Sequence, residues 1–208
     1  MSATTTSPST AVHEHILDTA ERLFYAQGIQ RVGVDAVVAA AGVSKRTLYK
    51  HFGSREQLVA AYLERRAARQ PAPAASAGAP LQEILGVFER LERWFGGGRF
   101  RGCPFSNAIA ELGGDPAHPA LAVARGVKAQ HTAWFESQLR RLQVSEPART
   151  AMQLSILVEG ALAGAMQRSD AAEAMQVARA AQAAAKTLLH AAGVAGCAPD
   201  RGSDGAPH

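Results

Sequence analysis

At 208 residues the chain is long enough to bury two modest hydrophobic cores. Hydrophobic residues make up 47% of it but aromatic residues only 6%, so its apolar content is mainly small and aliphatic, which favours helices over strands. The net charge of +4 allows an anionic partner without identifying one, and two cysteines are too few for a disulfide framework. We therefore expect an all-α chain in a reducing compartment.

The first ten residues and the hydropathy of the chain argue against a membrane location. Residues 1–10 are rich in Ser and Thr and lack an apolar core, so we expect a disordered tail rather than a signal peptide. No apolar run approaches the roughly 20 residues that a membrane-spanning helix needs. We expect a cytoplasmic protein with no membrane partner.

Helical periodicity and turn-forming residues predict four short helices in a first domain, residues 11–69. Glycines follow each of the first three apolar segments, at positions where a helix ends readily. Ser44 can cap the third helix, and residues 54–57 match a capping box that opens the fourth. We place the first three helices at about 12–27, 34–41 and 45–51.

A second domain is expected at residues 81–192, after a linker. The stretch 70–80 contains three prolines and no charge, so it cannot continue a regular helix. Asp170 and Glu173 form a capping box before the last helix, and residues 193–208 are expected to form a disordered tail. Apolar spacing places further helices at about 81–95, 104–112, 121–143, 147–167 and 171–190, which gives about nine in the chain.

The segment from residue 34 to residue 52 has the features of a helix-turn-helix that presents its second helix to a DNA groove. Small residues at 39–41 let the two helices approach, and Gly42 supplies the turn. Leu48 and Phe52 are four residues apart and are expected to face inward. The opposite surface is basic, because four Lys or Arg residues and no acid lie between residues 44 and 55.

The run VDAVVAAAGVSKRTLYKHFGSREQLVAAYL resembles the DNA-binding signature of the TetR (tetracycline repressor) family over its whole length. The resemblance covers about residues 11–66 and implies a three-helix DNA-binding domain with the helix-turn-helix on its second and third helices. In that family a Leu-Tyr-x-His-Phe run ends the recognition helix, which matches residues 48–52, and the tyrosine commonly contacts a phosphate. The chain departs from the family pattern at Gly33, where Ser or Thr is usual, and at Ala36, where an acid is frequent.

We predict that the outer face of the third helix divides its contacts between bases and phosphates. Arg46 can grip guanine through two hydrogen bonds and Thr47 can offer its methyl group to thymine, so both are expected at base edges. The alternative is that the basic run forms only a solvated surface helix, which the turn and the inward spacing argue against. Phosphate contacts are expected from Lys45, Tyr49, Lys50 and His51.

One such domain contacts few bases, so we expect a homodimer that sets two recognition helices about 34 Å apart on a double-stranded, palindromic operator. Small residues in the last two helices would let the helices of two copies approach as a four-helix bundle. The same faces could instead complete the core of a single chain. The predicted interface residues are Gly160, Gly164, Ala178, Ala181, Ala185 and Leu188.

The middle helices concentrate aromatic residues that could line a ligand pocket. The TetR resemblance implies an internal pocket there, for a small-molecule inducer of unknown identity, whereas core packing is the alternative for each residue taken singly. We expect no resident cofactor and no metal, since a lone histidine on an apolar face is usually a core residue. The predicted pocket residues are Trp94, Phe95, Phe105, Asn107, His131, Trp134 and Phe135.

The sequence favours a ligand-released repressor, in which ligand binding shifts the fourth helix and changes the spacing of the two recognition helices. A second hypothesis is a thiol-based sensor of oxidants or electrophiles that uses Cys103, with an inert buried thiol as its alternative. An enzyme is disfavoured because the sequence contains no phosphate loop, nucleophile elbow, paired metal-ligand motif or dinucleotide fingerprint. An activator would share every one of these features.

Overall fold

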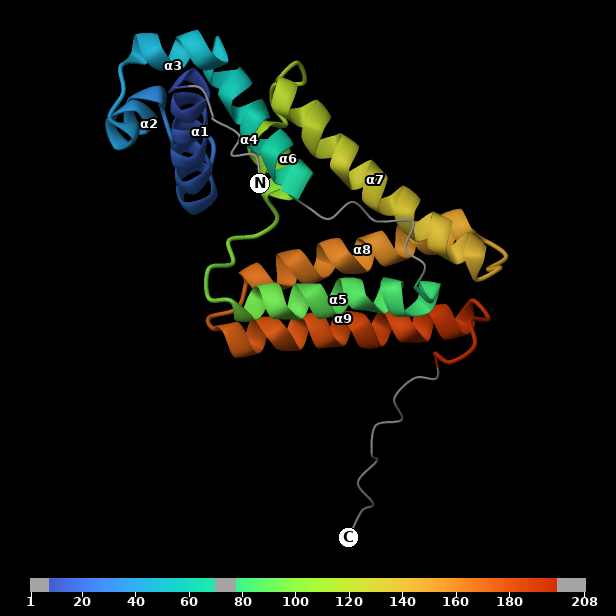
Figure 1. The fold of residues 1–208 in the computed structure, drawn as a ribbon. Coiled ribbons are helices and arrows are strands. Elements are labelled where there is room, and N and C mark those ends of the chain that lie inside the picture. The colour runs from blue at the N-terminus through green and yellow to red at the C-terminus, as the bar shows by residue number, and fades with distance from the viewer. Residues whose placement is uncertain (1–7, 70–77, 198–208) are drawn as a thin grey trace, which may run out of the picture. The chain divides into compact units, whose positions relative to one another are not determined.

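The computed structural model describes residues 8–69 and 78–197, and all regular structure in these ranges is α-helical (Figure 1). The predicted all-α class, with about nine helices, is confirmed for this part of the chain. Within the same ranges, no helix is both long enough and apolar enough to cross a bilayer. The helices are α1 Pro8–Gln27, α2 Val34–Ala41, α3 Lys45–Phe52, α4 Arg55–Arg69, α5 Pro80–Gly96, α6 Pro104–Leu112, α7 Pro119–Arg141, α8 Pro147–Met166 and α9 Ala171–Ala191.

The described residues form two compact units, one from residues 8–69 with 103–128 and one from residues 78–102 with 129–197. The sequence placed all of 81–192 in the second domain, but α6 and the first part of α7 group with the N-terminal helices. Buried Phe105 and Ala108 on α6 explain this, together with a hydrogen bond from the backbone N–H of Gln30 to Glu111. Residues 70–77 of the expected linker lie outside the described residues.

In the first unit, α1 packs against α2 and α4, and α3 packs against α2 and α4. The largest buried side chains there include Ile16, Leu48, Leu58 and Tyr62. Both α2 and α3 have only eight residues, a length at which an isolated helix is unstable in water. Packing on this core therefore holds both helices in place.

In the second unit, α5, α8 and α9 run side by side, with α9 opposite in direction to the other two (Figure 1). The predicted capping box of α9 is confirmed, because an Asp170 carboxylate oxygen accepts the backbone N–H of Glu173 at 2.9 Å. The Glu173 carboxylate in turn accepts the N–H of Ser169 at 3.3 Å. Arg179 on α9 is paired with Glu92 on α5, with 2.7 Å between Nε and Oε1.

At both ends, the described residues extend into stretches that the sequence predicted to be disordered tails. Helix α1 begins at Pro8, because proline is tolerated in the first turn, where no helical N–H bond is lost. After α9, the N–H of Val194 bonds the carbonyl of Leu189 at 3.0 Å, and both Val194 and Cys197 are buried. The remaining tail residues, 1–7 and 198–208, lie outside the described residues.

Candidate nucleic-acid interface

Helix α3 lies where the sequence predicts the recognition helix, and Ser44 fixes its start. The Ser44 hydroxyl accepts the backbone N–H of Thr47 at 3.0 Å. Gly42 turns the chain between α2 and α3 with a φ of 63°, a left-handed conformation that costs glycine little. The cap and the turn together set the direction in which α3 leaves α2.

The two faces of α3 divide as the spacing predicts. Leu48 and Phe52 are buried, so the inward face is confirmed. The outward face contains no acidic residue. Of the six residues predicted to contact DNA, Lys45, Arg46, Tyr49 and Lys50 are exposed, and Thr47 and His51 are half-buried.

Lys45 is not a free cation, because its Nζ atom lies 2.6 Å from a carboxylate oxygen of Asp35 on α2. The hydrogen bond to Asp35, together with the attraction between the two charges, raises the pKa of Lys45 above its usual value. Both side chains are exposed. The sequence analysis did not anticipate this pair, and the short separation of Asp35 and Lys45 across the turn was the available signal.

Two other predicted contact residues also have neighbours. The Thr47 hydroxyl lies 2.8 Å from the Ser44 hydroxyl, so it is engaged within the cap. The His51 ring lies edge-on to His13 of α1, with 5.9 Å between ring centroids, and His13 stacks on Phe52 at 4.4 Å. His13 was missed, because no local pattern places a residue of α1 beside the end of α3.

An ion-pair cluster fixes α4 against α1 behind this surface. A Glu21 carboxylate oxygen lies 2.6 Å from Arg65 Nη2, and the other lies 2.8 Å from Arg66 Nε. The side chains of Glu21 and Arg65 are only 12% and 11% exposed, so the charges interact with little screening. Arg66 also lies over the ring of Tyr25, and burial raises the pKa of the nearby Tyr62 phenol. These ion pairs therefore hold together α1 and α4, the two helices against which α2 and α3 pack.

Comparison with known proteins agrees with this geometry. The model of the family "Bacterial regulatory proteins, tetR family" matches residues 16–62. Two uncharacterized HTH-type transcriptional regulators of Mycobacterium tuberculosis strains are 45% identical over 56 residues. That match spans 27% of this chain and only 28% of the length of those relatives.

A solved tetR transcriptional regulator from Streptomyces avermitilis is 38% identical, and the match covers 88% of this chain and 98% of that one with a TM-score of 0.78. The chain belongs to the TetR family. A TetR-family regulator from Streptomyces coelicolor is 28% identical over 87% of this chain and 95% of its own, with a TM-score of 0.76. Reduced NemR from E. coli, 24% identical over 86% and 97% with a TM-score of 0.72, shares the fold. The predicted family and DNA-binding regulatory function are confirmed.

The residues predicted to line a ligand pocket in this TetR-family chain fall into separate groups. Phe105 and Asn107 belong to the first unit, and the other five belong to the second. Within the second unit, Trp94 and Phe95 pack around Phe100, with ring centroids 4.9 Å and 4.5 Å from it. On α7, Trp134 contacts Phe135 with 5.2 Å between centroids, and His131 is half-buried. In the described ranges no group of three or more His, Cys, Asp or Glu is placed to hold a metal ion.

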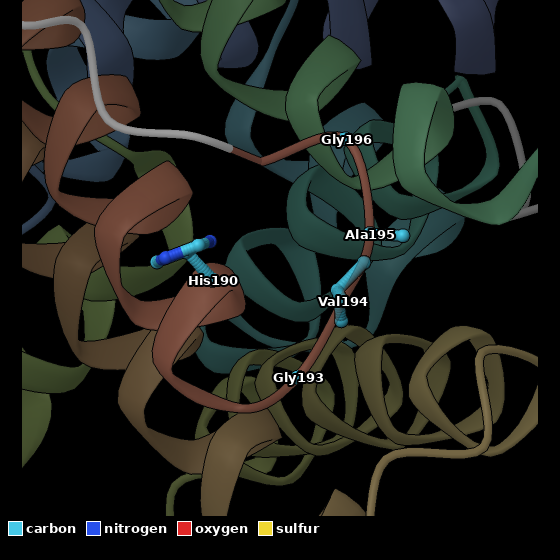
Figure 2. Close-up of a pocket in the computed structure, with 5 residues that line it drawn as sticks. All are labelled: His190, Gly193, Val194, Ala195 and Gly196. Atoms are coloured by element: carbon cyan, nitrogen blue, oxygen red, sulfur yellow. The ribbon is translucent and has the colours of Figure 1, made fainter.

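A hollow of about 340 Å³ lies at the end of α9 and in the loop that follows it. Figure 2 shows His190 on the last turn of α9 and Val194 and Ala195 on that loop. None of the seven predicted pocket residues lines this hollow.

The predicted dimer residues divide between the interior and the surface of the second unit. Ala178 and Ala185 are buried inside a single chain, where α9 packs on its neighbours, so they offer no surface to a second copy. Gly164 faces Val177, because a Cβ there would lie 3.0 Å from Val177 Cγ1. Ala181 and Leu188 are half-buried, and Gly160 is exposed.

The largest exposed apolar side chains of the second unit are Met152, Ile156 and Met166, all on α8. Sequence reasoning missed them, because it selected small residues and not large ones. Their spacing of four and fourteen residues places them on one helix face, which was the available signal.

Cys103 immediately precedes α6 and is buried. Its Sγ atom lies 3.2 Å from Nζ of Lys128 on α7, within the first unit. Two of its sequence neighbours, Arg99 and Arg101, are exposed. The cation that contacts the sulfur is thus Lys128 of α7, a helix that begins sixteen residues after Cys103.

Proposed function

We propose that this TetR-family regulator is a cytoplasmic repressor that binds a palindromic DNA operator as a homodimer and leaves it when a small molecule binds. The observation that carries the proposal is the outward face of α3, which is cationic and set at a fixed angle by the Ser44 cap and the Gly42 turn. On that face Arg46 and Lys50 have no ion-pair partner among the described residues. Both are therefore available to a polyanion without breaking an existing pair.

The six residues on α3 divide by chemistry into two roles. Arg46 presents a guanidinium that suits the two acceptors of guanine in the major groove, and Thr47 lies next to it. Lys45, Tyr49, Lys50 and His51 suit phosphate oxygens, which position the protein without specifying sequence. Tyr49 is 43% exposed, although an aromatic ring is usually buried, which supports a role at a surface that becomes covered.

The apolar stripe of Met152, Ile156 and Met166 supports a homodimer through α8. Each side chain is more than half exposed in a single chain, and the three lie on one face of α8. A helix that pairs with its copy along such a face would form the four-helix arrangement expected from the sequence, with α9 alongside. Gly160 lies between these residues and allows close approach.

A small-molecule site among the middle helices is supported by one polar atom. The indole Nε1 of Trp134 is buried and has no hydrogen-bond partner in the described part of the chain. A buried donor without a partner costs free energy, and a bound ligand with an acceptor atom would offset that cost. The aromatic cluster around Phe100 would supply apolar contact area on the same unit.

A gel-shift titration with DNA from beside the protein's own gene tests the repressor proposal. We expect a shifted complex whose affinity falls steeply with salt, and a footprint covering two inverted half-sites. A duplex carrying one half-site should bind far more weakly than the full palindrome. Equal affinity for the full and the half duplex would argue against the dimer, and no salt-sensitive affinity for any duplex would argue against the function.

A thiol-based sensor is the second candidate, and the contact between Lys128 and Cys103 favours it. A thiolate is the reactive form of cysteine, and a neighbouring ammonium stabilises a thiolate. With N-ethylmaleimide as the probe, the sulfur would form a bond to one alkene carbon, and a proton would go to the other carbon as the alkene bond is lost. We expect the reagent to release DNA from the wild type but not from Cys103→Ser.

Cys197 provides a matched control for that experiment. It is buried like Cys103, and burial raises the pKa of its thiol above the usual value. The Cys197→Ser variant should lose DNA on treatment as the wild type does. Release that persists in Cys103→Ser would contradict the sensor role of this thiol.

A further inference from the structure

The loop of residues 28–32, between α1 and α2, is held by hydrogen bonds from two other helices, α4 and α6. From α4, the Arg55 guanidinium donates to the carbonyl oxygens of Ile29 and Val32, with distances of 3.2 Å and 3.3 Å to Val32. From α6, the Glu111 carboxylate accepts the backbone N–H of Gln30 at 2.8 Å. The Gln30 side-chain amide also donates to the Glu111 carbonyl oxygen. Hydrogen bonds with a charged partner are the stronger kind, so these contacts hold the loop firmly.

Gly28 allows Glu111 to come this close. Its φ is +94°, a conformation that side-chain-bearing residues rarely adopt, and a Cβ at this position would lie 3.3 Å from Glu111 Oε2. Ile29 and Val32 are both buried, so the loop cannot shift without disturbing the core of the first unit. The position of the loop is therefore coupled to that of α6.

The loop leads directly into the helix-turn-helix. Helix α2 begins at Val34, and its N-cap residue Gly33 provides no side-chain hydrogen bond. Its first turn is closed by the backbone bond from the N–H of Val37 to the Gly33 carbonyl, which is long at 3.4 Å. Most helices of this kind are fixed at their start by a capping side chain. Here the start of α2 is fixed instead by the preceding loop, which is held by hydrogen bonds to Arg55 and Glu111.

We infer that Glu111 is a positioning residue for DNA binding: through Gln30 it ties α6 to the start of the helix-turn-helix. Glu111 does not itself contact DNA in this proposal. The inference rests on DNA binding by α3 and not on release by a ligand. It assigns to α6 a direct contact with the loop that precedes the helix-turn-helix, in addition to the packing of α4 on α1 and α3.

The sign of the effect separates positioning from simple electrostatics. Glu111 is negative, so removing its charge would by long-range attraction strengthen the binding of a polyanion. Loss of positioning weakens binding instead. Glu111→Ala removes the acceptor for the Gln30 N–H, whereas Glu111→Gln keeps an acceptor oxygen while losing the same charge.

The experiment measures DNA affinity against salt for the wild type, Glu111→Ala and Glu111→Gln, with the duplex from beside the gene. We expect Glu111→Ala to bind roughly tenfold more weakly, or about 1.4 kcal/mol, with an unchanged salt slope because no phosphate contact is lost. Glu111→Gln should bind within about twofold of the wild type. Gln30→Ala, which removes only the side-chain bond, should show a smaller loss. The matched control is Glu136→Ala, which removes an exposed-face ion pair with Arg140 in the second unit.

Hydrogen exchange shows whether the effect is local. In Glu111→Ala without DNA, the amides of Gln30 and Val37 should exchange faster, while amides in α9 should not. Affinity in Glu111→Ala at or above that of the wild type would overturn the proposal. So would an equal loss in Glu111→Gln, or faster exchange spread over the whole chain. Absence of binding by the wild type is a different result, which overturns DNA binding by α3 itself and leaves Glu111 nothing to position.

Discussion

Lys45, the first residue of the recognition helix, is paired with Asp35 on the preceding helix, with 2.6 Å between Nζ and the nearer carboxylate oxygen. The pair spans the turn of the helix-turn-helix at the surface expected to meet DNA. A phosphate must therefore compete with a carboxylate for this lysine. We therefore expect Asp35 to limit the affinity of the protein for any duplex, whatever its sequence.

Replacing Asp35 with Asn should strengthen DNA binding, because it frees Lys45 and removes a negative charge from the interface. We expect a severalfold gain at low salt for unrelated as well as specific duplexes, and a salt slope steeper by about one ion. The fold should be unaffected, since exposed ion pairs contribute little stability. Glu136→Gln makes the same change of charge in the second unit and should leave the slope unchanged; an identical slope in Asp35→Asn would show that Lys45 does not reach a phosphate.

Arg46 and Lys50 should differ in what their loss does. Arg46→Ala removes a base contact, so it should reduce discrimination against a changed base pair by about 1–3 kcal/mol. Lys50→Ala removes a phosphate contact, so it should weaken all sequences alike and lower the salt slope by about one. Competition titrations with matched and mutated duplexes measure both quantities. The same profile in both variants would contradict the assignment of roles.

Ile156→Glu should convert a dimer into a monomer at micromolar concentration. The substitution places a charge in the centre of the exposed apolar stripe on α8, where burial against a second copy would remove it from water. Light scattering after size exclusion measures the mass, and DNA affinity should fall with it. Gln82→Glu adds the same charge at an exposed position on α5 and should keep the wild-type mass. A dimer that persists in Ile156→Glu would locate the interface elsewhere.

Glu21→Ala should destabilise the first unit by about 2 kcal/mol, because it removes the one nearly buried carboxylate that pairs with the guanidinium of Arg65. Arg65 keeps its more exposed partner Asp18 at 2.7 Å, which limits the loss. Urea unfolding followed by circular dichroism measures the change. Glu136→Ala removes an exposed pair and should cost less than about 1 kcal/mol. If the two variants lost equal stability, the cluster around Glu21 would be no more than a surface feature.

Local signals in the sequence predicted the helices well. Gly42, Ser44 and the Asp170 capping box act on residues within a few positions, so their effects can be deduced without knowing the fold. The inward face of α3 followed from the four-residue spacing of Leu48 and Phe52 in the same way.

The contacts that were missed join residues far apart in the chain or depend on which side of a helix is covered. Gln30 and Glu111 are 81 positions apart, and nothing near either residue indicates that α6 contacts the loop between α1 and α2. The alanines of α9 lie on more than one face, so composition alone could not tell that Ala178 and Ala185 face inward. Only the packing of α5 and α8 on α9 settles that question.

The two ends of α6 have different chemistry. At its start the Cys103 thiol lies beside the Lys128 ammonium, and near its end the Glu111 carboxylate bonds Gln30 in the loop before α2. The nine residues of α6 span only about 13 Å, at about 1.5 Å per residue. Cys103 and Glu111 are therefore joined by little more than two helical turns. An adduct on Cys103 that displaced α6 would thus also disturb the bond from Glu111 to Gln30, in the loop that precedes α2.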